Sequence, residues 1–188
     1  MNALLDVFNY LFHIIITFYI YVVIIRLLLG LTRADFHNPF SQFILTLTNP
    51  VLIPLRKIIP SIGGIDTSAI LLIFVLKFIE LVAANLLIGK NLLLASLIIP
   101  TIFGLANQLI NVFIFAIIAL VVISWLAAFM PGHNNPLTSV LHSITNPLMR
   151  PVRKLIPPIG IFDLSTFVVL LGLLAVKRFL WHFYYMPF

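Results

Sequence analysis

The chain has 188 residues, of which 62% are hydrophobic and only 9% are charged. A soluble domain carries charge on about a quarter of its residues, so this composition excludes a soluble globular protein and indicates one that faces lipid. The chain has no cysteine, which excludes disulfides, thiolate metal sites and a cysteine nucleophile. Its formal net charge of +6 comes from basic residues that border apolar runs, which favours contact with anionic lipid headgroups over nucleic acid.

Apolar runs recur along the chain, and each is long enough to cross a hydrocarbon core of about 30 Å. The first is expected to be retained rather than cleaved as a signal peptide, because it is preceded by Asp6 instead of a basic region. We predict an all-α membrane protein with four transmembrane helices, over residues 11–31, 67–89, 105–130 and 164–184.

Polar and proline-containing motifs recur without a gap at an offset of 97 residues (135 minus 38). We interpret them as an internal repeat of a span–loop–span unit. Because each unit crosses the membrane an even number of times, the two copies are expected to be parallel rather than inverted. The recurring residues are Asn38, Pro39, Asn49, Pro50, Pro54, Pro60, Gly63 and Asp66 in the first copy, and Asn135, Pro136, Asn146, Pro147, Pro151, Pro157, Gly160 and Asp163 in the second.

A short apolar segment, residues 92–103, separates the two copies. A helix of that length reaches only about 20 Å, and Pro100 and Gly104 interrupt the run. We therefore predict a dipping or interfacial segment; a crossing would invert the second copy. This divides the chain into a first module at 1–89, an apolar linker at 90–104 and a second module at 105–188.

The loop after Asn38 is too apolar for an ordinary connection. Asn38 is expected to cap a short helix that has Pro39 at its first position and an apolar stripe of Phe40, Phe43, Ile44 and Leu47. Asn49-Pro50 is expected to end this helix, since the residue before proline avoids the helical region. A second short apolar piece would follow over residues 51–59, and the second copy repeats the pattern with Leu137, Val140, Leu141 and Ile144.

Basic side chains border both loops. An amphipathic helix lying in the membrane interface would let them reach lipid phosphates; a re-entrant loop is the alternative, and the sequence does not separate the two. The positive-inside rule places both loops in the cytoplasm and both termini in the periplasm, although Lys177 and Arg178 weigh against this orientation. The candidate contacts with lipid or a partner are Arg56, Lys57, Arg150, Arg153 and Lys154.

These motifs together resemble the YggT (YlmG-like) family of small membrane proteins. The resemblance rests on Asn-Pro-Phe-Ser-Gln at 38–42, on the paired Asn-Pro, on Pro-x-Arg-Lys-x-Ile-Pro at 54–60 with its counterpart at 151–157, and on the Gly and Asp that follow each motif. It covers almost the whole chain and is similar to the two-module proteobacterial members. It implies a bacterial inner-membrane protein linked to osmotic-stress tolerance, division or assembly of membrane complexes, with no firmly assigned biochemical activity. The second copy departs from the first in having Gly160-Ile161 in place of Gly63-Gly64.

Charged residues inside the spans are further candidates. Lys77 and Glu80 lie three residues apart on one helix face, where either a neutralising pair or a transport role explains them. Arg26 is expected to snorkel to the headgroups, with pairing to Glu80 or to a loop carboxylate as the alternative. Asp66 and Asp163 are expected to cap the spans that follow them, and the duplicated asparagines to brace turns beside their prolines or to bind an ion or headgroup.

No cofactor, metal site or enzymatic motif is recognised, and the five histidines are scattered. The leading hypothesis is a non-enzymatic membrane scaffold or assembly factor that acts through its basic interfacial loops. The alternative is a small oligomeric ion or solute channel that uses Lys77 and Glu80. The expected partners are membrane lipids with anionic headgroups; a homo-oligomer and a cytoplasmic or membrane protein partner stay open, and no nucleic acid is expected.

Overall fold

The computed structural model describes residues 3–87, 93–129, 136–156 and 163–184. In this part of the chain the regular elements are all helices, joined by turns and one isolated bridge between Ile62 and Ile65, which confirms the predicted fold class. The elements are α1 (Ala3–Leu31), α2 (Pro39–Ile58), α3 (Thr67–Leu87), the 3₁₀ helix η1 (Leu94–Leu97), α4 (Ile98–Phe129), α5 (Pro136–Leu155) and α6 (Leu164–Tyr184).

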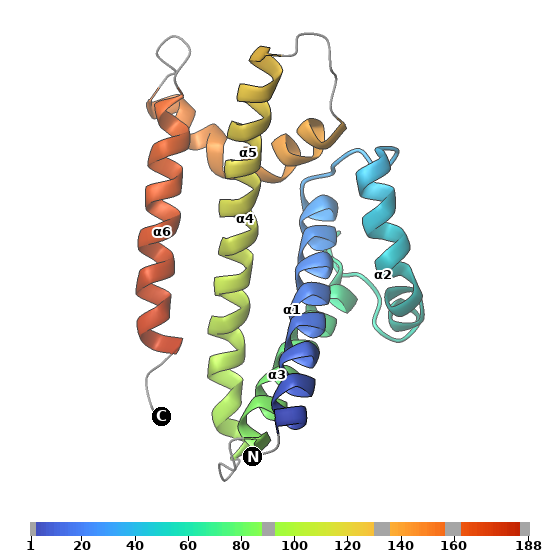
Figure 1. Cartoon of the computed structure of the whole chain (residues 1–188). Coiled ribbons are helices and arrows are strands. Elements are labelled where there is room, and N and C mark those ends of the chain that lie inside the picture. The colour runs from blue at the N-terminus through green and yellow to red at the C-terminus, as the bar shows by residue number, and fades with distance from the viewer. Residues whose placement is uncertain (1–2, 88–92, 130–135, 157–162, 185–188) are drawn as a thin grey trace.

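Four helical stretches are long and apolar enough to cross a membrane: Val7–Leu31, Thr67–Leu86, Leu94–Leu126 and Leu164–His182. They correspond to the four predicted spans. In Figure 1, α1 and α4 run in one direction and α3 and α6 run in the other, so that α2 and α5 both begin at the same end of the bundle. The two modules are therefore parallel, as predicted.

The apolar segment before the third span is not a separate dipping element. After η1, α4 begins at Ile98 and runs through Pro100 and Gly104 without a break. Pro100 lies in the first helical turn, where backbone amides have no acceptor within the helix, so its missing amide hydrogen costs no hydrogen bond. Gly104 is buried in the bundle, where a small residue allows close helix approach. The expected interruption is absent for these reasons, and residues 98–103 lengthen the third span.

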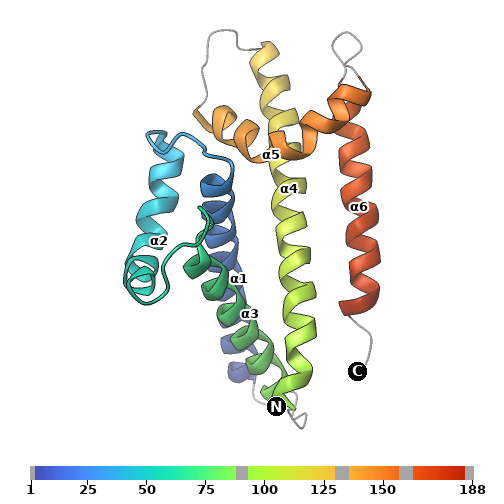
Figure 2. The ribbon, with the colours of Figure 1, turned by 180° about the vertical axis from the view of Figure 1, so that it is seen from behind.

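The loop helices are also longer than predicted. Asn49-Pro50 does not end the first of them, because α2 continues through Pro50 and Pro54, and α5 likewise continues through Pro147 and Pro151. A proline removes one backbone hydrogen bond and bends a helix, while packing on both sides can keep the two halves helical. Figure 2 shows the bend in α5 where it crosses α4.

The apolar stripe of α2 divides between two environments. Ile44 is buried in the core and Phe40 packs against it, but Phe43 and Leu47 point outward. The buried face of α2 instead includes the polar residues Ser41 and Thr48. In α5 the predicted stripe is the packing face, since Val140, Leu141 and Ile144 are all buried.

The two loop helices occupy different positions although their sequences correspond. The core gathers around α1, whose buried residues include Ile20, Val23, Ile24 and Leu29. Helix α2 lies beside α1, whereas α5 crosses α4 and also contacts α1 and α2 (Figures 1 and 2). The duplication is therefore symmetric in its spans and asymmetric in its loops.

Candidate functional sites

Asn38 joins the two modules. Its Oδ1 accepts a hydrogen bond from the Phe40 amide at 2.9 Å, which is the predicted N-cap, and Pro39 follows at the start of α2. Its Nδ2 donates to the carbonyl of Pro136 at 2.7 Å and to Ser139 Oγ at 3.1 Å. One side chain thus caps α2 and binds the first turn of α5, a link that the sequence did not reveal.

An arginine–aspartate pair recurs in both modules. Arg56 donates to both carboxylate oxygens of Asp66, and Arg153 donates to Asp163 Oδ2 from Nε at 3.0 Å and from Nη2 at 2.7 Å. The partners are ten residues apart in each copy, across the connection from the loop helix to the next span. Both arginines were predicted as contacts for lipid or a partner. In the structure, each guanidinium donates two hydrogen bonds to a carboxylate of the same chain.

The same aspartates cap the spans, as predicted. Asp66 Oδ1 accepts from the Ala69 amide at 3.2 Å, and Asp163 Oδ1 accepts from the Ser165 amide at 3.0 Å. Burial raises the pKa of Asp66, but hydrogen bonds from Arg56 and the Ala69 amide outweigh burial, so this pKa lies below its ordinary value of 3.8. The pKa of Asp163 is lowered in the same way, with burial opposed by Arg153.

Serine hydroxyls fasten the connections in both modules. Ser68 Oγ donates to the carbonyl of Ile59 at 2.6 Å, and Ser165 Oγ donates to the carbonyl of Ile156 at 2.6 Å. The carbonyl of Pro60, just after α2, accepts from Thr67 Oγ1 at 2.7 Å. Each loop helix is therefore tied at its end to the first turn of the following span.

A tight turn precedes Asp66 in the first module. Ile62 and Ile65 exchange backbone hydrogen bonds of 3.2 and 3.0 Å around Gly63 (φ 61°) and Gly64 (φ 82°). Positive φ values at both central residues favour glycine, since a side chain would meet the backbone. Ile161 occupies the position that corresponds to Gly64, so the second module cannot repeat this turn without strain.

Arg26 is hydrogen-bonded to the loop helix α2 and does not pair with Glu80. It is only 6% exposed, and its Nη1 donates to Thr48 Oγ1 at 2.6 Å and to Asn49 Oδ1 at 2.9 Å. Asn49 therefore does not brace a turn but accepts a hydrogen bond from the first span. In the second module the position of Arg26 is held by Ile123 (26 plus 97), so Asn146 has no such donor opposite it.

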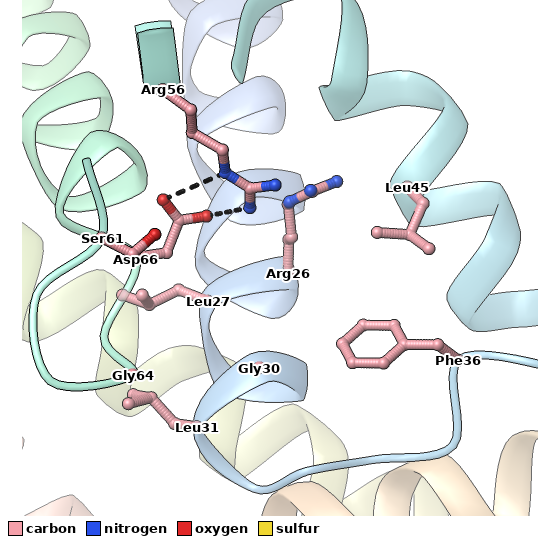
Figure 3. Close-up of a pocket in the computed structure, with 10 residues that line it drawn as sticks. All are labelled: Arg26, Leu27, Gly30, Leu31, Phe36, Leu45, Arg56, Ser61, Gly64 and Asp66. Atoms are coloured by element: carbon pink, nitrogen blue, oxygen red, sulfur yellow. Dashed lines mark hydrogen bonds and ion pairs between the residues drawn. The ribbon is translucent and has the colours of Figure 1, made fainter. Parts of the chain in front are cut away.

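A pocket of about 380 Å³ adjoins Arg26 between α1, α2 and the connection that leads to α3. Figure 3 shows the guanidinium groups of Arg26 and Arg56 beside each other in it, with Asp66 on the far side of Arg56. Leu27, Gly30, Leu31, Phe36, Leu45, Ser61 and Gly64 complete the lining.

Three of the predicted basic contacts stay on the surface. Lys57, Arg150 and Lys154 are exposed, and none makes an ion pair with the described part of the chain. Lys57 lies in the last turn of α2 and Lys154 in the last turn of α5. None of these three side chains is held by a carboxylate of the described residues, whereas Arg56 and Arg153 each are.

Lys77 and Glu80 form the predicted pair inside the third helix. Lys77 Nζ lies 2.9 Å from Glu80 Oε1, and both residues are buried. His13 Nδ1 of α1 lies 3.0 Å from the same oxygen, a contact that reasoning from spacing missed because the two residues belong to different spans. The other oxygen, Glu80 Oε2, is buried without a hydrogen bond to the described residues.

A second polar connection crosses three spans. Lys177 Nζ of α6 donates to Asn111 Oδ1 of α4 at 2.7 Å, and Asn111 Nδ2 donates to Tyr21 Oη of α1 at 3.2 Å. Asn107 and Gln108 lie on the same part of α4, each with a buried oxygen that has no partner among the described residues. Lys177 thus faces α4 within the bundle.

The remaining motif residues follow the helices. Pro136 is the first residue of α5, and Asn146 lies within it. Asn135, Pro157 and Gly160 lie outside the described residues. Within the described part of the chain, no group of three or more His, Asp or Glu side chains is placed to hold a metal ion.

Four spans, a duplicated loop helix and a repeated Arg–Asp pair define a multi-pass helical membrane protein built from two copies of one module. The chain belongs to the CCB3/YggT family, whose model matches residues 4–87 and again 99–184. The first match lies within the first predicted module, and the second begins in the predicted linker and covers most of the second module.

Relatives from proteobacteria agree with this assignment. A protein of Pseudomonas aeruginosa is 38% identical over 157 residues, which cover 82% of this chain and 78% of that protein. A Vibrio alginolyticus protein is 38% identical over 160 residues, covering 82% and 83%. The Escherichia coli K12 protein YggT is 29% identical over 177 residues, covering 94% and 88%. No solved structure matches the chain.

Proposed function

We propose that this protein is a non-enzymatic scaffold or assembly factor of the bacterial inner membrane, which gathers anionic lipid or a protein partner at the basic edges of α2 and α5. The proposal rests on a difference between the basic residues of the loops. Arg56 and Arg153 hold the loops to the spans, and this leaves Lys57, Arg150 and Lys154 exposed beside outward-facing apolar residues. A cation next to an apolar surface suits the headgroup region of a membrane.

The rest of the proposal follows from this placement. Because the spans of the two modules run in the same directions, both loops would lie on one side of the membrane, which the positive-inside rule makes cytoplasmic, and their cations would act on the same leaflet. Rigid loop helices tied at both ends would hold a partner in a fixed position. We assign such a scaffold to the envelope processes that the family resemblance implies: osmotic-stress response, division or biogenesis of membrane complexes.

The test neutralises the exposed cations and leaves the Arg–Asp pairs intact. A Lys57→Gln, Arg150→Gln, Lys154→Gln triple variant in nanodiscs of mixed phosphatidylglycerol and phosphatidylcholine should lose the enrichment of anionic lipid that the wild type shows. Each exposed cation near a charged surface contributes about 1 kcal/mol, so the effect should weaken as salt rises. Arg178→Gln removes a positive charge from the opposite end of α6 and serves as the matched control.

A second experiment measures whether the triple variant supports cell growth. In Escherichia coli lacking its YggT relative, wild-type protein should support growth under osmotic upshift better than an equal amount of the triple variant. A triple variant that matched wild type in both lipid enrichment and growth would refute the proposal.

A second candidate function, an oligomeric ion or solute channel, is favoured by one observation. Lys77 and Glu80 pair inside the bundle, and the exposed His13 of α1 contacts the same carboxylate from outside; buried charges in a span commonly mark ion or proton pathways. Potassium and proton flux in proteoliposomes separates the two functions. Flux that disappears in a Lys77→Met, Glu80→Gln double variant would establish the channel, and absence of flux from well-folded wild type would exclude it.

A further inference from the structure

We infer that the pocket between α1 and α2 is a binding site for one anionic phospholipid, with the lipid phosphate between Arg26 and Arg56. The inference deepens the proposed function and rests on it in one respect, the placement of the loops in a leaflet with anionic lipid. It concerns a specific site rather than the exposed surface of Lys57, Arg150 and Lys154.

The first step is the electrostatic imbalance at Arg26. Arg26 as a whole is 6% exposed, and its two hydrogen-bond partners, Thr48 and Asn49, are both neutral. A buried charge is costly unless an opposite charge faces it. The nearest carboxylate, Asp66, is bonded to Arg56 rather than to Arg26. Two guanidinium groups therefore line the pocket with a single carboxylate, which Arg56 binds, and the pocket carries an excess positive charge.

The second step is the geometry of the unused donors. Only Nη1 of Arg26 is engaged by the described residues, and Arg56 uses Nε and Nη2 on Asp66. Nε and Nη2 of Arg26 and Nη1 of Arg56 keep donors without partners there. Figure 3 shows the two groups facing one pocket, and the charge of Arg56 repels that of Arg26. A phosphate between them would relieve the repulsion and accept several charge-assisted hydrogen bonds.

The third step distinguishes a lipid from a free anion. The rest of the lining is largely apolar, with Leu27 and Leu31 on one side of Arg26 and Phe36 and Leu45 on the other (Figure 3). Leu31 and Phe36 are partly exposed at its rim, so the apolar wall continues onto the outer surface of α1. A cavity that holds two cations and has exposed apolar residues at its rim fits a molecule with a phosphate and an acyl chain. Arg26 lies five residues before the end of the span, about 7 Å along the helix axis, within reach of the headgroup region.

The second module supplies an internal comparison. Its counterparts of Arg26 and Gly64 are Ile123 and Ile161, while the Arg153–Asp163 pair is kept. The ion pair therefore belongs to the module architecture, whereas the additional buried arginine belongs to the first module alone. We assign the lipid site to the first module only.

The experiment titrates the full-length protein in detergent with phosphatidylglycerol, with phosphatidylcholine and with inorganic phosphate, and counts bound molecules by native mass spectrometry. Wild type should retain one phosphatidylglycerol more tightly than any further lipid. Arg26→Met should weaken that first site about tenfold, the equivalent of one charge-assisted hydrogen bond. Phosphatidylcholine should bind more weakly because its choline cation faces the same arginines.

A second variant occupies the pocket and keeps both arginines. Gly30 lines the pocket, and a Cβ built there meets nothing within 4 Å, so Gly30→Leu should exclude the acyl chain without disturbing the fold. Gly172→Leu on α6, where a Cβ also meets nothing within 4 Å, is the matched control and should retain the lipid. Gly30→Leu keeps the test decisive if Arg26→Met fails to fold.

The outcomes separate this inference from the proposed function. Unchanged retention in Gly30→Leu would overturn the inference, and inorganic phosphate that displaced the lipid at equal concentration would overturn the lipid assignment. The Lys57, Arg150, Lys154 variant should keep the single tight lipid, and its loss there would mean that the surface cations rather than the pocket hold the lipid.

Discussion

Arg153 and Asp163 are joined by two hydrogen bonds in the second module, and the pair reproduces Arg56 and Asp66 at the offset of the sequence repeat (153 minus 56 and 163 minus 66 are both 97). The carboxylate also caps α6, so the guanidinium holds the end of α5 to the start of the following span. The Arg-Lys pair in each loop therefore has two roles. Its arginine holds the loop to the following span, and its lysine is exposed at the surface.

The first prediction concerns this pair. Arg153→Gln should lower the free energy of unfolding by about 1 kcal/mol, since the pair is partly exposed and solvent screens it. Arg150→Gln, three residues earlier on the same helix and without an ion pair to the described residues, should change stability by less than about 0.5 kcal/mol. Thermal unfolding in detergent measures both. Equal effects would show that the Arg153–Asp163 pair contributes nothing specific.

The second prediction is a pH dependence. The pKa values of Asp66 and Asp163 lie below the ordinary 3.8 in the folded protein. A carboxyl with a depressed folded-state pKa contributes stability that is present above its unfolded-state pKa and is lost as the pH falls through the folded-state pKa. Stability contributed by these groups should therefore be constant from pH 7 to about 5 and should fall below about pH 4. The Asp66→Asn, Asp163→Asn double variant should lack this acid transition, and an identical transition in that variant would assign it elsewhere.

The third prediction concerns the buried pair in α3. Glu80→Gln leaves Lys77 buried without its counter-charge and should destabilise the protein by about 3 kcal/mol, whereas Lys77→Met with Glu80→Gln should cost less than the single change. The yield and melting temperature of purified protein give the comparison. If the double variant were the less stable of the two, the residues would be acting independently.

Much of this architecture is predictable from the sequence. The length of an apolar run indicates a membrane span, and motifs repeated at a constant offset indicate duplication. The four spans, the parallel modules and the caps of Asn38, Asp66 and Asp163 are all of this kind. Each depends on residues close together in the chain or on the repeat offset.

What the sequence did not reveal depends on neighbours that only the fold creates. Proline was expected to end the loop helix, but packing on both sides of Pro50 keeps α2 continuous. The Arg56–Asp66 pair spans ten residues and an irregular turn, where helical spacing gives no guidance. The donor to Asn49 lies on another helix, 23 residues away.

The fourth prediction tests the polar connection across the spans. Asn111→Leu removes the acceptor of Lys177 and the donor to Tyr21 together. Interhelical hydrogen bonds of this kind contribute about 0.6 kcal/mol each inside membranes, so the loss should be about 1 kcal/mol plus the cost of leaving Lys177 without its acceptor. Lys177→Met should be milder, because it removes the charge along with the bond. Unfolding of the two variants in the same detergent decides the order, and a more stable Asn111→Leu would show that the connection is not structural.

The fifth prediction concerns the double glycine of the first module. Gly64 has a φ of 82°, a conformation that costs a residue with a side chain about 1–2 kcal/mol, so Gly64→Ala should destabilise the turn by that amount. Gly30→Ala is the matched control: Gly30 lies in helix α1 and a Cβ there meets nothing within 4 Å, so alanine should be neutral or should stabilise by up to about 1 kcal/mol. Proteolysis of the connection between α2 and α3 should accelerate in Gly64→Ala and not in Gly30→Ala. Because Gly64 lines the pocket beside Arg56 and Asp66, Gly64→Ala should also weaken the first bound lipid; equal proteolysis rates in the two variants would show that the turn does not need glycine.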